Sequence, residues 1–473
     1  MPQPSGPVSD GVEAQKLDGY LVFLFLLLST ATLFDGFDSA MFSFAAPDVR
    51  TTLDISREEW GFVSGATRLG VMASFLFLLT ADRLGRRSVM MVTVVGFTIA
   101  NGLTAFATDK ASFIAFQFLA RLFLTAEYAL AVIVIGEETP ARLRGRAIAI
   151  LTSLATVGVM AMAKLQPYIL LEEGADGNAL HDFGAALVAG VQGFLGLAVD
   201  GESWRALYAL GAFPLVLVFG LRIAMRETRR FEAHQARAEA EVDAPGRGAA
   251  SAGQGWREWI RVQVRNAMIP WKPEYRRQTA VVTLLWNCVH AVTGPSTVYW
   301  VIFAREDLGL GTSDVGDIVF YGYGGGVAGH FVAGDLIDRI GRKWTCSGFY
   351  VAAAVSIYQL YHVPTLEGQY LWMIATVFCF GAANTATHVY ASELFPTEIR
   401  ATGYGWTTNF LGRVTEVVVP VVIGLLILPL GGIPPAIAVV AVGPVIGAVL
   451  VAVYAPETRG LTLEEVQEAL RRP

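Results

Sequence analysis

A short charged sequence occurs twice in this chain, first as Asp82-Arg83-Leu84-Gly85-Arg86-Arg87 and again as Asp338-Arg339-Ile340-Gly341-Arg342-Lys343. A second motif is also repeated, because Glu137-Glu138-Thr139-Pro140 with Arg144 downstream returns as Glu393-Leu394-Phe395-Pro396 with Arg400 downstream. Positions 82 and 338 lie 256 residues apart, and so do positions 140 and 396. Equal spacing at two separate places indicates an internal duplication. The chain therefore has two halves with the same order of elements and the same sidedness.

The composition places both halves in a membrane. Hydrophobic residues make up 54% of the 473 residues, charged residues make up only 16%, and the mean hydropathy is +0.49. An apolar run of about 20 residues crosses the hydrocarbon core of a bilayer. Such runs lie at residues 19–46, 61–81, 88–108, 112–136, 146–171, 205–225, 279–304, 314–337, 344–363, 370–392, 402–430 and 433–455. The sequence thus predicts an all-α membrane protein with twelve transmembrane helices in two pseudo-symmetric six-helix bundles.

Basic residues indicate which side of the membrane each loop faces. They gather in loops of one parity, whereas the other parity has only scattered examples such as Arg50, Arg57, Lys110 and Arg305. Because basic loops stay in the cytoplasm, both termini are expected there. The first apolar run is too long and too charged for a cleaved signal peptide. The expected parts are a cytoplasmic tail (1–18), a first bundle (19–225), a cytoplasmic linker (226–277), a second bundle (278–455) and a cytoplasmic tail (456–473).

An irregular stretch, residues 172–203, falls on the outer side. Its mildly apolar part, from Phe183 to Leu197, is expected to form a short surface helix or a pore-lining loop, and not a thirteenth span.

Several classes of function are disfavoured by the sequence. The net charge is −6, with the basic residues on the side where anionic lipids lie, so no nucleic-acid partner is expected. The three cysteines and six histidines are dispersed, which argues against a metal site or a disulfide framework. No phosphate-cradling loop of the Walker type is present, so ATP-driven transport is disfavoured and no cofactor is expected.

The repeated motifs resemble those of the major facilitator superfamily, and the resemblance extends to Pro456-Glu457-Thr458-Arg459-Gly460 near the C-terminus. Within that superfamily, Asp35-Gly36-Phe37-Asp38, Glu127-Tyr128 and Trp204-Arg205 look like bacterial proton symporters for organic acids, including the sialate and aromatic-acid groups. The resemblance implies a transporter that rocks between two states, and not an enzyme.

Acids followed by arginines at helix ends can clamp neighbouring helix termini in one conformation and release them in the other. The first copy departs from the family pattern, with Leu78 where Gly334 stands in the second. The alternative is that the arginines only satisfy the positive-inside bias. The predicted gating residues are Asp82, Arg83, Gly85, Arg86, Arg87, Glu137, Arg144, Asp338, Arg339, Gly341, Arg342, Glu393 and Arg400.

Charges that are not repeated indicate the working groups, because ionisable side chains are rare within a membrane unless they pair or function. Asp35, Asp38 and Glu127 are the proton-coupling candidates, and the corresponding positions 256 residues later are uncharged. Asp35 and Asp38 are spaced i, i+3 and share one face of a helix. The alternative is that these acids pair permanently with Arg121 as structural elements.

Cations within the apolar segments favour an anionic substrate. Arg121 and Arg413 are candidates, since guanidinium binds carboxylates well, although Glu416 lies three residues from Arg413 and is placed to neutralise it. Lys164 is expected either to meet a carboxylate or to extend to the outer interface. Hydrogen-bonding candidates are Asn287, His290, Asn384 and His388.

These residues together predict a monomeric secondary transporter in the cell membrane that imports a small organic anion with protons by alternating access. Three alternatives remain open: a sugar or polyol facilitator or a sugar-porter type of proton symporter, a drug antiporter, and a membrane sensor that binds without transporting.

Overall fold

The computed structural model describes residues 19–139, 141–172, 177–196, 199–227, 261, 265, 268–294, 298–396, 399–461 and 465, and in these the regular structure is helical. The first half contains α1 (Gly19–Phe44), α2 (Ala46–Thr52), α3 (Arg57–Leu84), α4 (Arg86–Thr104), α5 (Lys110–Glu138), α6 (Ala141–Leu165), η1 (Gln166–Tyr168), α7 (Ala179–Leu195) and α8 (Ser203–Arg222). The second half contains η2 (Ile269–Trp271), α11 (Arg276–Gly294), α12 (Trp300–Ile302), η4 (Phe303–Asp307), α13 (Thr312–Ile340), α14 (Arg342–His362), α15 (Leu366–Leu394), α16 (Arg400–Gly405), η5 (Trp406–Phe410), η6 (Leu411–Arg413), α17 (Val414–Leu430), α18 (Ile433–Val440) and α19 (Val442–Tyr454).

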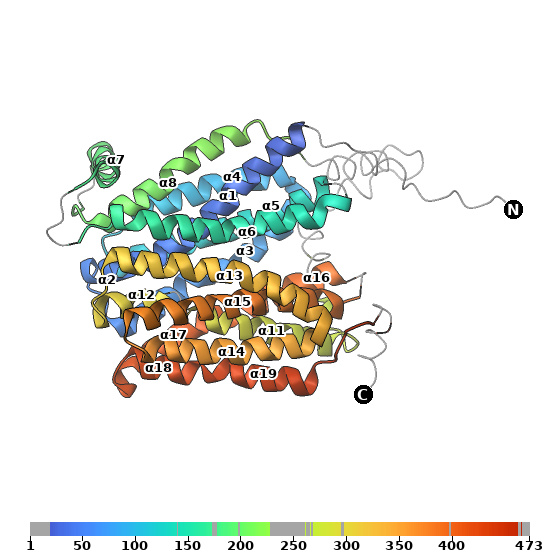
Figure 1. Cartoon of the computed structure of the whole chain (residues 1–473). Coiled ribbons are helices and arrows are strands. Elements are labelled where there is room, and N and C mark those ends of the chain that lie inside the picture. The colour runs from blue at the N-terminus through green and yellow to red at the C-terminus, as the bar shows by residue number, and fades with distance from the viewer. Residues whose placement is uncertain are drawn as a thin grey trace, which may run out of the picture.

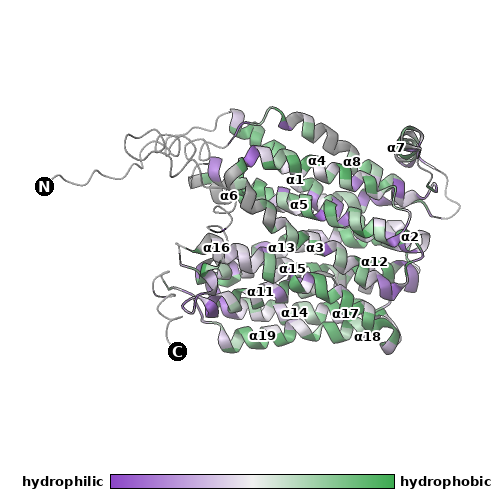
Figure 2. Ribbon diagram, turned by 180° about the vertical axis from the view of Figure 1, so that it is seen from behind, coloured by the Kyte–Doolittle hydropathy of each residue, from purple (hydrophilic) through white to green (hydrophobic). Residues whose placement is uncertain are grey.

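The long helices run side by side along one direction (Figure 1). In the described part of the chain they form twelve crossings, made by α1, α3, α4, α5, α6, α8, α11 with α12, α13, α14, α15, α16 with α17, and α18 with α19. Five of these segments are long and apolar enough to span a membrane by composition alone. The other segments contain charged residues or many glycines, and they are expected to cross the membrane packed among neighbouring helices. Hydrophobic residues, coloured green, predominate along the helical ribbons in Figure 2.

Helix α1 begins and α19 ends at the same end of the bundle, which we call the terminal face, and α2, α7 and α18 lie at the opposite face (Figure 1). Packing is mainly within each half, as between α1 and α6, and between α13 and α15. The two halves meet through α3 against α17 and through α6 against α13. Most of the predicted linker, 226–277, lies outside the described residues, so the predicted domain boundaries stay predictions.

Helix α7 corresponds to the expected surface helix. Its first turn is capped by Asn178, whose side-chain oxygen accepts hydrogen bonds from the backbone N–H of Leu180 (3.1 Å) and His181 (3.2 Å). It ends at Gly196, which has φ +65°. Figure 1 shows α7 end-on beside helices seen from the side, so α7 lies across their direction and is not a span.

The opposite face is closed by contacts between the halves. Gly61 and Gly424 bring α3 and α17 so close that a Cβ on Gly61 would overlap the carbonyl oxygen of Pro420. Gly316 brings α13 equally close to the backbone of Ala163 on α6. Toward the terminal face α6 and α13 separate (Figures 1 and 2). The structure is therefore a conformation in which the halves are joined at the opposite face.

Candidate functional site

The repeated loops occupy equivalent helix junctions in the two halves. Gly85 (φ +88°) separates α3 from α4, and Gly341 (φ +98°) separates α13 from α14. Arg86 donates to the carboxylate of Glu137 at 3.1 Å, and Arg342 donates to Glu393 at 2.9 Å. Further contacts in these loops are Arg342 to Asp338, Arg339 to Asp335, and Arg87 to the carbonyl oxygen of Ile223. The role of these loops in gating stays a prediction, and the side chains of Asp82, Arg83, Arg144 and Arg400 lie outside the described part.

Two carboxylates at these junctions were missed by the sequence analysis. Glu227 accepts hydrogen bonds from the backbone N–H of Arg86 (2.9 Å) and Arg87 (3.2 Å) at the start of α4. Glu457 accepts from the backbone N–H of Arg342 (2.9 Å) at the start of α14. An acid is favoured at a helix N-terminus because unpaired N–H groups point toward it. The signal was available, since Glu-Thr-Arg occurs at both 227–229 and 457–459.

A small cavity lies between the two halves. Its volume is about 70 Å³, and residues of α1, α3 and α6 face residues of the second half across it. Its polar or aromatic lining residues are Ser39, Ser43, Phe44, Arg68, Trp300, Tyr323 and Glu416. The guanidinium of Arg68 is 3.4 Å from the carboxylate of Glu416, and both residues are more than nine-tenths buried. This ion pair joins the two halves at the cavity.

Glu416 is the centre of a charged cluster in the second half. Its carboxylate accepts a hydrogen bond from Arg413 at 2.8 Å and lies 3.8 Å from Nδ1 of His290. Arg413 is thus engaged by Glu416, which was the alternative stated for it. The sequence analysis missed Arg68, although the same test of repetition detects it, because position 324 is a glycine.

Asp38 and Arg121 form a second charged group, inside the first half. Asp38 is 2% exposed, and neither of its carboxylate oxygens has a hydrogen-bonding partner among the described residues. The positive charge acting on it comes from Arg121, whose guanidinium lies 5.0 Å from the ring centre of Phe42. Buried polar groups that lack a protein partner usually bind ordered water. The group therefore resembles a small hydrated pocket.

Asp35 connects the two charged groups. It is partly exposed, and the charges acting on it are those of Asp38 and Arg121 on one side and of Arg413 and Glu416 on the other. Asp35 therefore lies within range of charges from both halves, whereas Asp38 is acted on by Arg121 of the first half.

Glu127 is placed differently from the other two predicted acids. It forms an ion pair with Arg222 on α8 and accepts a hydrogen bond from Thr93 at 2.6 Å. Both partners belong to the first half, and Glu127 and Arg222 are buried. Glu127 is therefore paired, as the structural alternative expected, but with Arg222 and not with Arg121.

The remaining predicted residues separate into structural ties and accessible groups. Asn287 donates to the carbonyl oxygen of Leu411 at 3.0 Å and accepts from the N–H of Thr415 at 3.0 Å, so it fastens α11 to the start of α17. Lys164 forms an ion pair with Asp317 on α13 at 2.5 Å and is partly exposed, and its predicted role in binding a substrate carboxylate stays a prediction.

Histidines and aromatic rings form a continuous stack in the second half. Trp286 stacks on His290 with ring centres 5.6 Å apart and meets His388 edge-on at 4.5 Å. His388 is bonded to the hydroxyl of Tyr404, yet it is solvent-accessible although it lies deep within the bundle. Asn384, one turn before His388, is half-buried and has no hydrogen bond among the described side chains. His388 and Asn384 are thus the predicted residues of this region that remain accessible.

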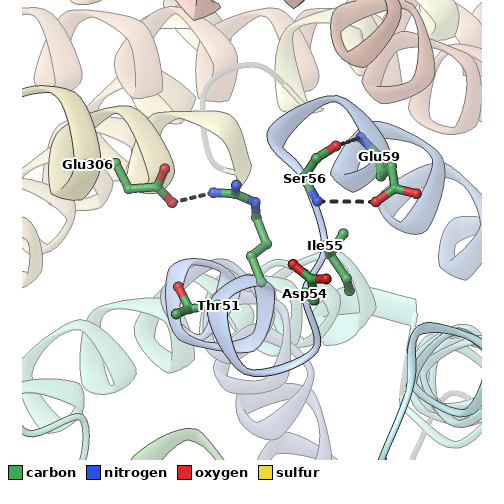
Figure 3. Close-up of a pocket in the computed structure, with 7 residues that line it drawn as sticks. Thr51, Asp54, Ile55, Ser56, Glu59 and Glu306 are labelled. Atoms are coloured by element: carbon green, nitrogen blue, oxygen red, sulfur yellow. Dashed lines mark hydrogen bonds and ion pairs between the residues drawn. The ribbon is translucent and has the colours of Figure 1, made fainter.

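A larger groove of about 570 Å³ lies at the opposite face, where α2 meets α3 and η4 (Figure 3). Arg50 reaches across it to Glu306, and Arg57 binds both Glu306 (2.6 Å) and Asp307 (2.8 Å). Since the arginines belong to the first half and the acids to the second, these ion pairs hold the two halves together. The ion pairs of Arg86, Arg339 and Arg342 at the terminal face, by contrast, each join residues of the same half.

Asp48 on α2 lies beside this network. Burial raises the pKa of Asp48 to about 6, Arg305 acts in the opposite direction, and Glu202 and Glu306 add to the increase.

Two helical halves that enclose a charged cavity and are joined at one face define a transporter of the alternating-access class. The sequence profile of the Major Facilitator Superfamily matches residues 28–420 and, in an overlapping match, residues 296–471. The chain belongs to this superfamily, and it is accordingly a multi-pass membrane protein and not an enzyme.

Bacterial transporters are similar to this chain in sequence or in fold. A putative niacin/nicotinamide transporter, NiaP of Bacillus subtilis, is 25% identical over 83% of this chain and 86% of its own length. A gallate transporter of Pseudomonas putida is 26% identical over 86% of this chain and 85% of its own length. The inward open structure of the xylose transporter XylE from E. coli superposes with a TM-score of 0.70 at 17% identity, covering 95% of this chain and all of that one. The last comparison shows a shared fold.

Proposed function

We propose that this protein imports a small aromatic or related organic acid together with protons, by alternating access in the cell membrane. The observation that carries the proposal is the buried carboxylate of Asp38, which has no hydrogen-bonding partner among the described residues and lies beside Arg121; Asp35 on the same helix is also acted on by the charges of Arg413 and Glu416 in the second half. Similarity to a putative niacin/nicotinamide transporter and to a gallate transporter supports the choice of substrate class.

The predicted orientation of the termini indicates to which side of the membrane this conformation opens. If both termini are cytoplasmic, the joined face is the outer one, and the structure corresponds to the inward-facing state. Lys and Arg in the loops of the terminal face support this orientation.

The proposed cycle uses the charges in sequence. In the outward-facing state a proton neutralises an acid of the Asp35–Asp38 pair, and the substrate anion binds to the cations between the halves. Rocking of the halves then exposes both to the cytoplasm, where the anion and the proton leave. The transporter is proposed to act as a monomer, because each chain contains both halves of the cavity.

A sugar or polyol facilitator is the second candidate from the sequence. It is less well supported, because a neutral substrate that moves down its gradient requires neither a buried unpartnered acid nor a cluster of guanidinium groups. A sensor that only binds its ligand would not require ion pairs that join the halves at one face.

The test is uptake into proteoliposomes of labelled nicotinate, benzoate and xylose, with and without an inward proton gradient. We expect gradient-driven accumulation of at least one acid. Asp38→Asn should abolish accumulation while exchange of labelled for unlabelled acid continues, because binding does not require the proton to leave. Asp54→Asn, at an exposed acid of the opposite face, is the control. Full accumulation by the Asp38→Asn protein would refute the coupling role, and equilibration of xylose alone would refute the substrate class.

A further inference from the structure

Arg68 is a buried cation to which no function has been given so far. It lies on α3, is 6% exposed, and lines the cavity between the halves. Its contact with Glu416 is long at 3.4 Å, and its Nε has no hydrogen-bonding partner among the described residues. A guanidinium has five N–H donors arranged for bidentate binding of a carboxylate, so Arg68 retains unused donors at the cavity.

The other two central guanidinium groups do not line this cavity, although the Nε of each also lacks a hydrogen-bonding partner among the described residues. Arg413 belongs to the second half and is bound by Glu416 at 2.8 Å. Arg121 lies inside the first half, where Phe42 covers it and Asp38 is its nearby acid. Of these three, Arg68 is the one that lines the cavity.

The cavity is suited to a carboxylate attached to a ring. Trp300, Tyr323 and Phe44 provide aromatic surface on several sides, and the indole N–H of Trp300 is fixed by Gln369 at 2.8 Å. A volume of about 70 Å³ accommodates a carboxylate or a few waters, whereas a cavity of roughly 150 Å³ holds benzene. The cavity must therefore widen to admit the ring.

We propose that Arg68 anchors the carboxylate of the substrate, and that Glu416 is the resident carboxylate that holds Arg68 until the substrate arrives. The proposal rests on the transport of organic acids proposed above. The substrate carboxylate takes the donors of Arg68 that face the cavity, and Glu416 remains bound to Arg413. Because Arg68 and Glu416 belong to different halves, exchanging one carboxylate for another also breaks a contact between the halves.

The charges of the central side chains predict how many protons accompany each substrate molecule. The central side chains contain three guanidinium groups (Arg68, Arg121 and Arg413) and three carboxyl groups (Asp35, Asp38 and Glu416). The described cluster is thus neutral when all three acids are ionised. One added monocarboxylate leaves an excess negative charge in a low-dielectric site, and a single proton on the Asp35–Asp38 pair removes it. One proton is therefore expected to accompany each monocarboxylate.

The experiment compares benzoate with benzamide, which have the same ring but differ in charge. Binding of each to the full-length protein in nanodiscs is measured by calorimetry for the wild type, Arg68→Gln, Arg413→Gln and Glu416→Gln. The wild type should prefer benzoate by about ten- to a hundredfold, the range expected for a hydrogen-bonded charged pair. Arg68→Gln should reduce this preference to near unity and leave benzamide binding unchanged, whereas Arg413→Gln should retain most of it.

Glu416→Gln should change the preference for benzoate over benzamide in the opposite direction. Removing the resident charge should tighten benzoate binding, so the preference for the acid should increase. If Arg68 and Glu416 were only a structural tie, both variants would weaken binding of the acid and the amide alike, and the inference would be wrong. An unchanged preference in Arg68→Gln, or a loss confined to Arg413→Gln, would also refute it. A wild type that binds no aromatic acid but takes up xylose would refute the proposed function itself.

Discussion

Individual buried charges in this protein have two distinct environments. Glu127 and Arg121 lie on the same helix, α5, yet Glu127 is closely paired with Arg222 whereas Arg121 faces an acid that has no hydrogen bond among the described residues. A tight buried pair is costly to break, because separating it leaves a charge in a low-dielectric environment. The pairing of each charge therefore distinguishes structural acids from those proposed to work.

This distinction predicts opposite outcomes for two conservative substitutions. Glu127→Gln leaves Arg222 buried without its counter-ion, and it should lower the free energy of unfolding by about 3–5 kcal/mol. Asp38→Asn removes no hydrogen bond of the described structure and should change stability little. Thermal unfolding in detergent measures both, and the double variant Glu127→Gln with Arg222→Met should recover part of the loss. Equal destabilisation by the two single substitutions would contradict the assignment.

Asp48 predicts a pH dependence of stability at the opposite face. Its pKa is raised from 3.8 to about 6, so between these values the folded protein holds a proton that the unfolded chain has released. The contribution of Asp48 is therefore most favourable below pH 4 and is lost as the pH rises toward 6, by at most about 3 kcal/mol. In Asp48→Asn, the melting temperature should lose this part of its dependence on pH between pH 4 and 7. Asp54→Asn is the control, because Asp54 is exposed and asparagine tolerates its φ of +50°.

Among the helices, close packing depends on glycine at specific positions. Gly36 on α1 and Gly158 on α6 bring the two backbones together, and a Cβ at either position would overlap the partner helix. This contact holds Asp35 and Asp38 in their orientation, since both lie on α1 beside Gly36. The position of the proposed proton site thus depends on a backbone contact and not on the acids themselves.

Gly158→Ala should therefore force α1 and α6 apart. We expect destabilisation of about 1–3 kcal/mol, which is typical of overpacking, and reduced uptake with it. Gly190→Ala is the matched control within a helix, because nothing lies within 4 Å of a Cβ at that position in α7. Removing a helical glycine there should be neutral or slightly stabilising. Normal stability and uptake in Gly158→Ala would show that the contact is dispensable.

At the scale of the whole molecule, the two halves are joined mainly at one face. Ion pairs from Arg50 and Arg57 to Glu306 and Asp307 cross between the halves there, as does Lys164 with Asp317. Each such pair is partly exposed and contributes little alone, typically about 0.2–1 kcal/mol. A modest contribution suits a contact that must break in every cycle.

Arg57→Gln should shift the equilibrium toward the state that opens the opposite face. A cysteine at Ser43, which is buried near that face, would report the shift through its reaction with a membrane-impermeant maleimide. The three native cysteines are buried, so background labelling should be low. We expect the rate to rise roughly two- to fivefold. Lys110→Gln is the control, because Lys110 pairs with Glu59 within the same half. An equal effect of both variants would contradict the proposal that the ion pairs between the halves stabilise this conformation.

The sequence by itself determined the two halves, the twelve crossings and the equivalent placement of Arg86 and Arg342. These depend on hydropathy, repeat spacing and helix-end chemistry, all of which are local properties of the chain. It also identified the acids of α1 and α5 as candidates, because their charges are not repeated. Their roles as proton carriers remain predictions.

Only the tertiary structure decided which charges meet. Arg68 and Glu416 are 348 positions apart and belong to different halves, and Lys164 finds Asp317 across the same interface. Such contacts depend on how each helix is rotated about its axis and how close glycines let its neighbours approach. Apolar composition leaves that rotation undetermined, because a helix that is hydrophobic on most sides has no preferred face. The pairing that separates Glu127 from Asp38 therefore appears only when the helices are packed.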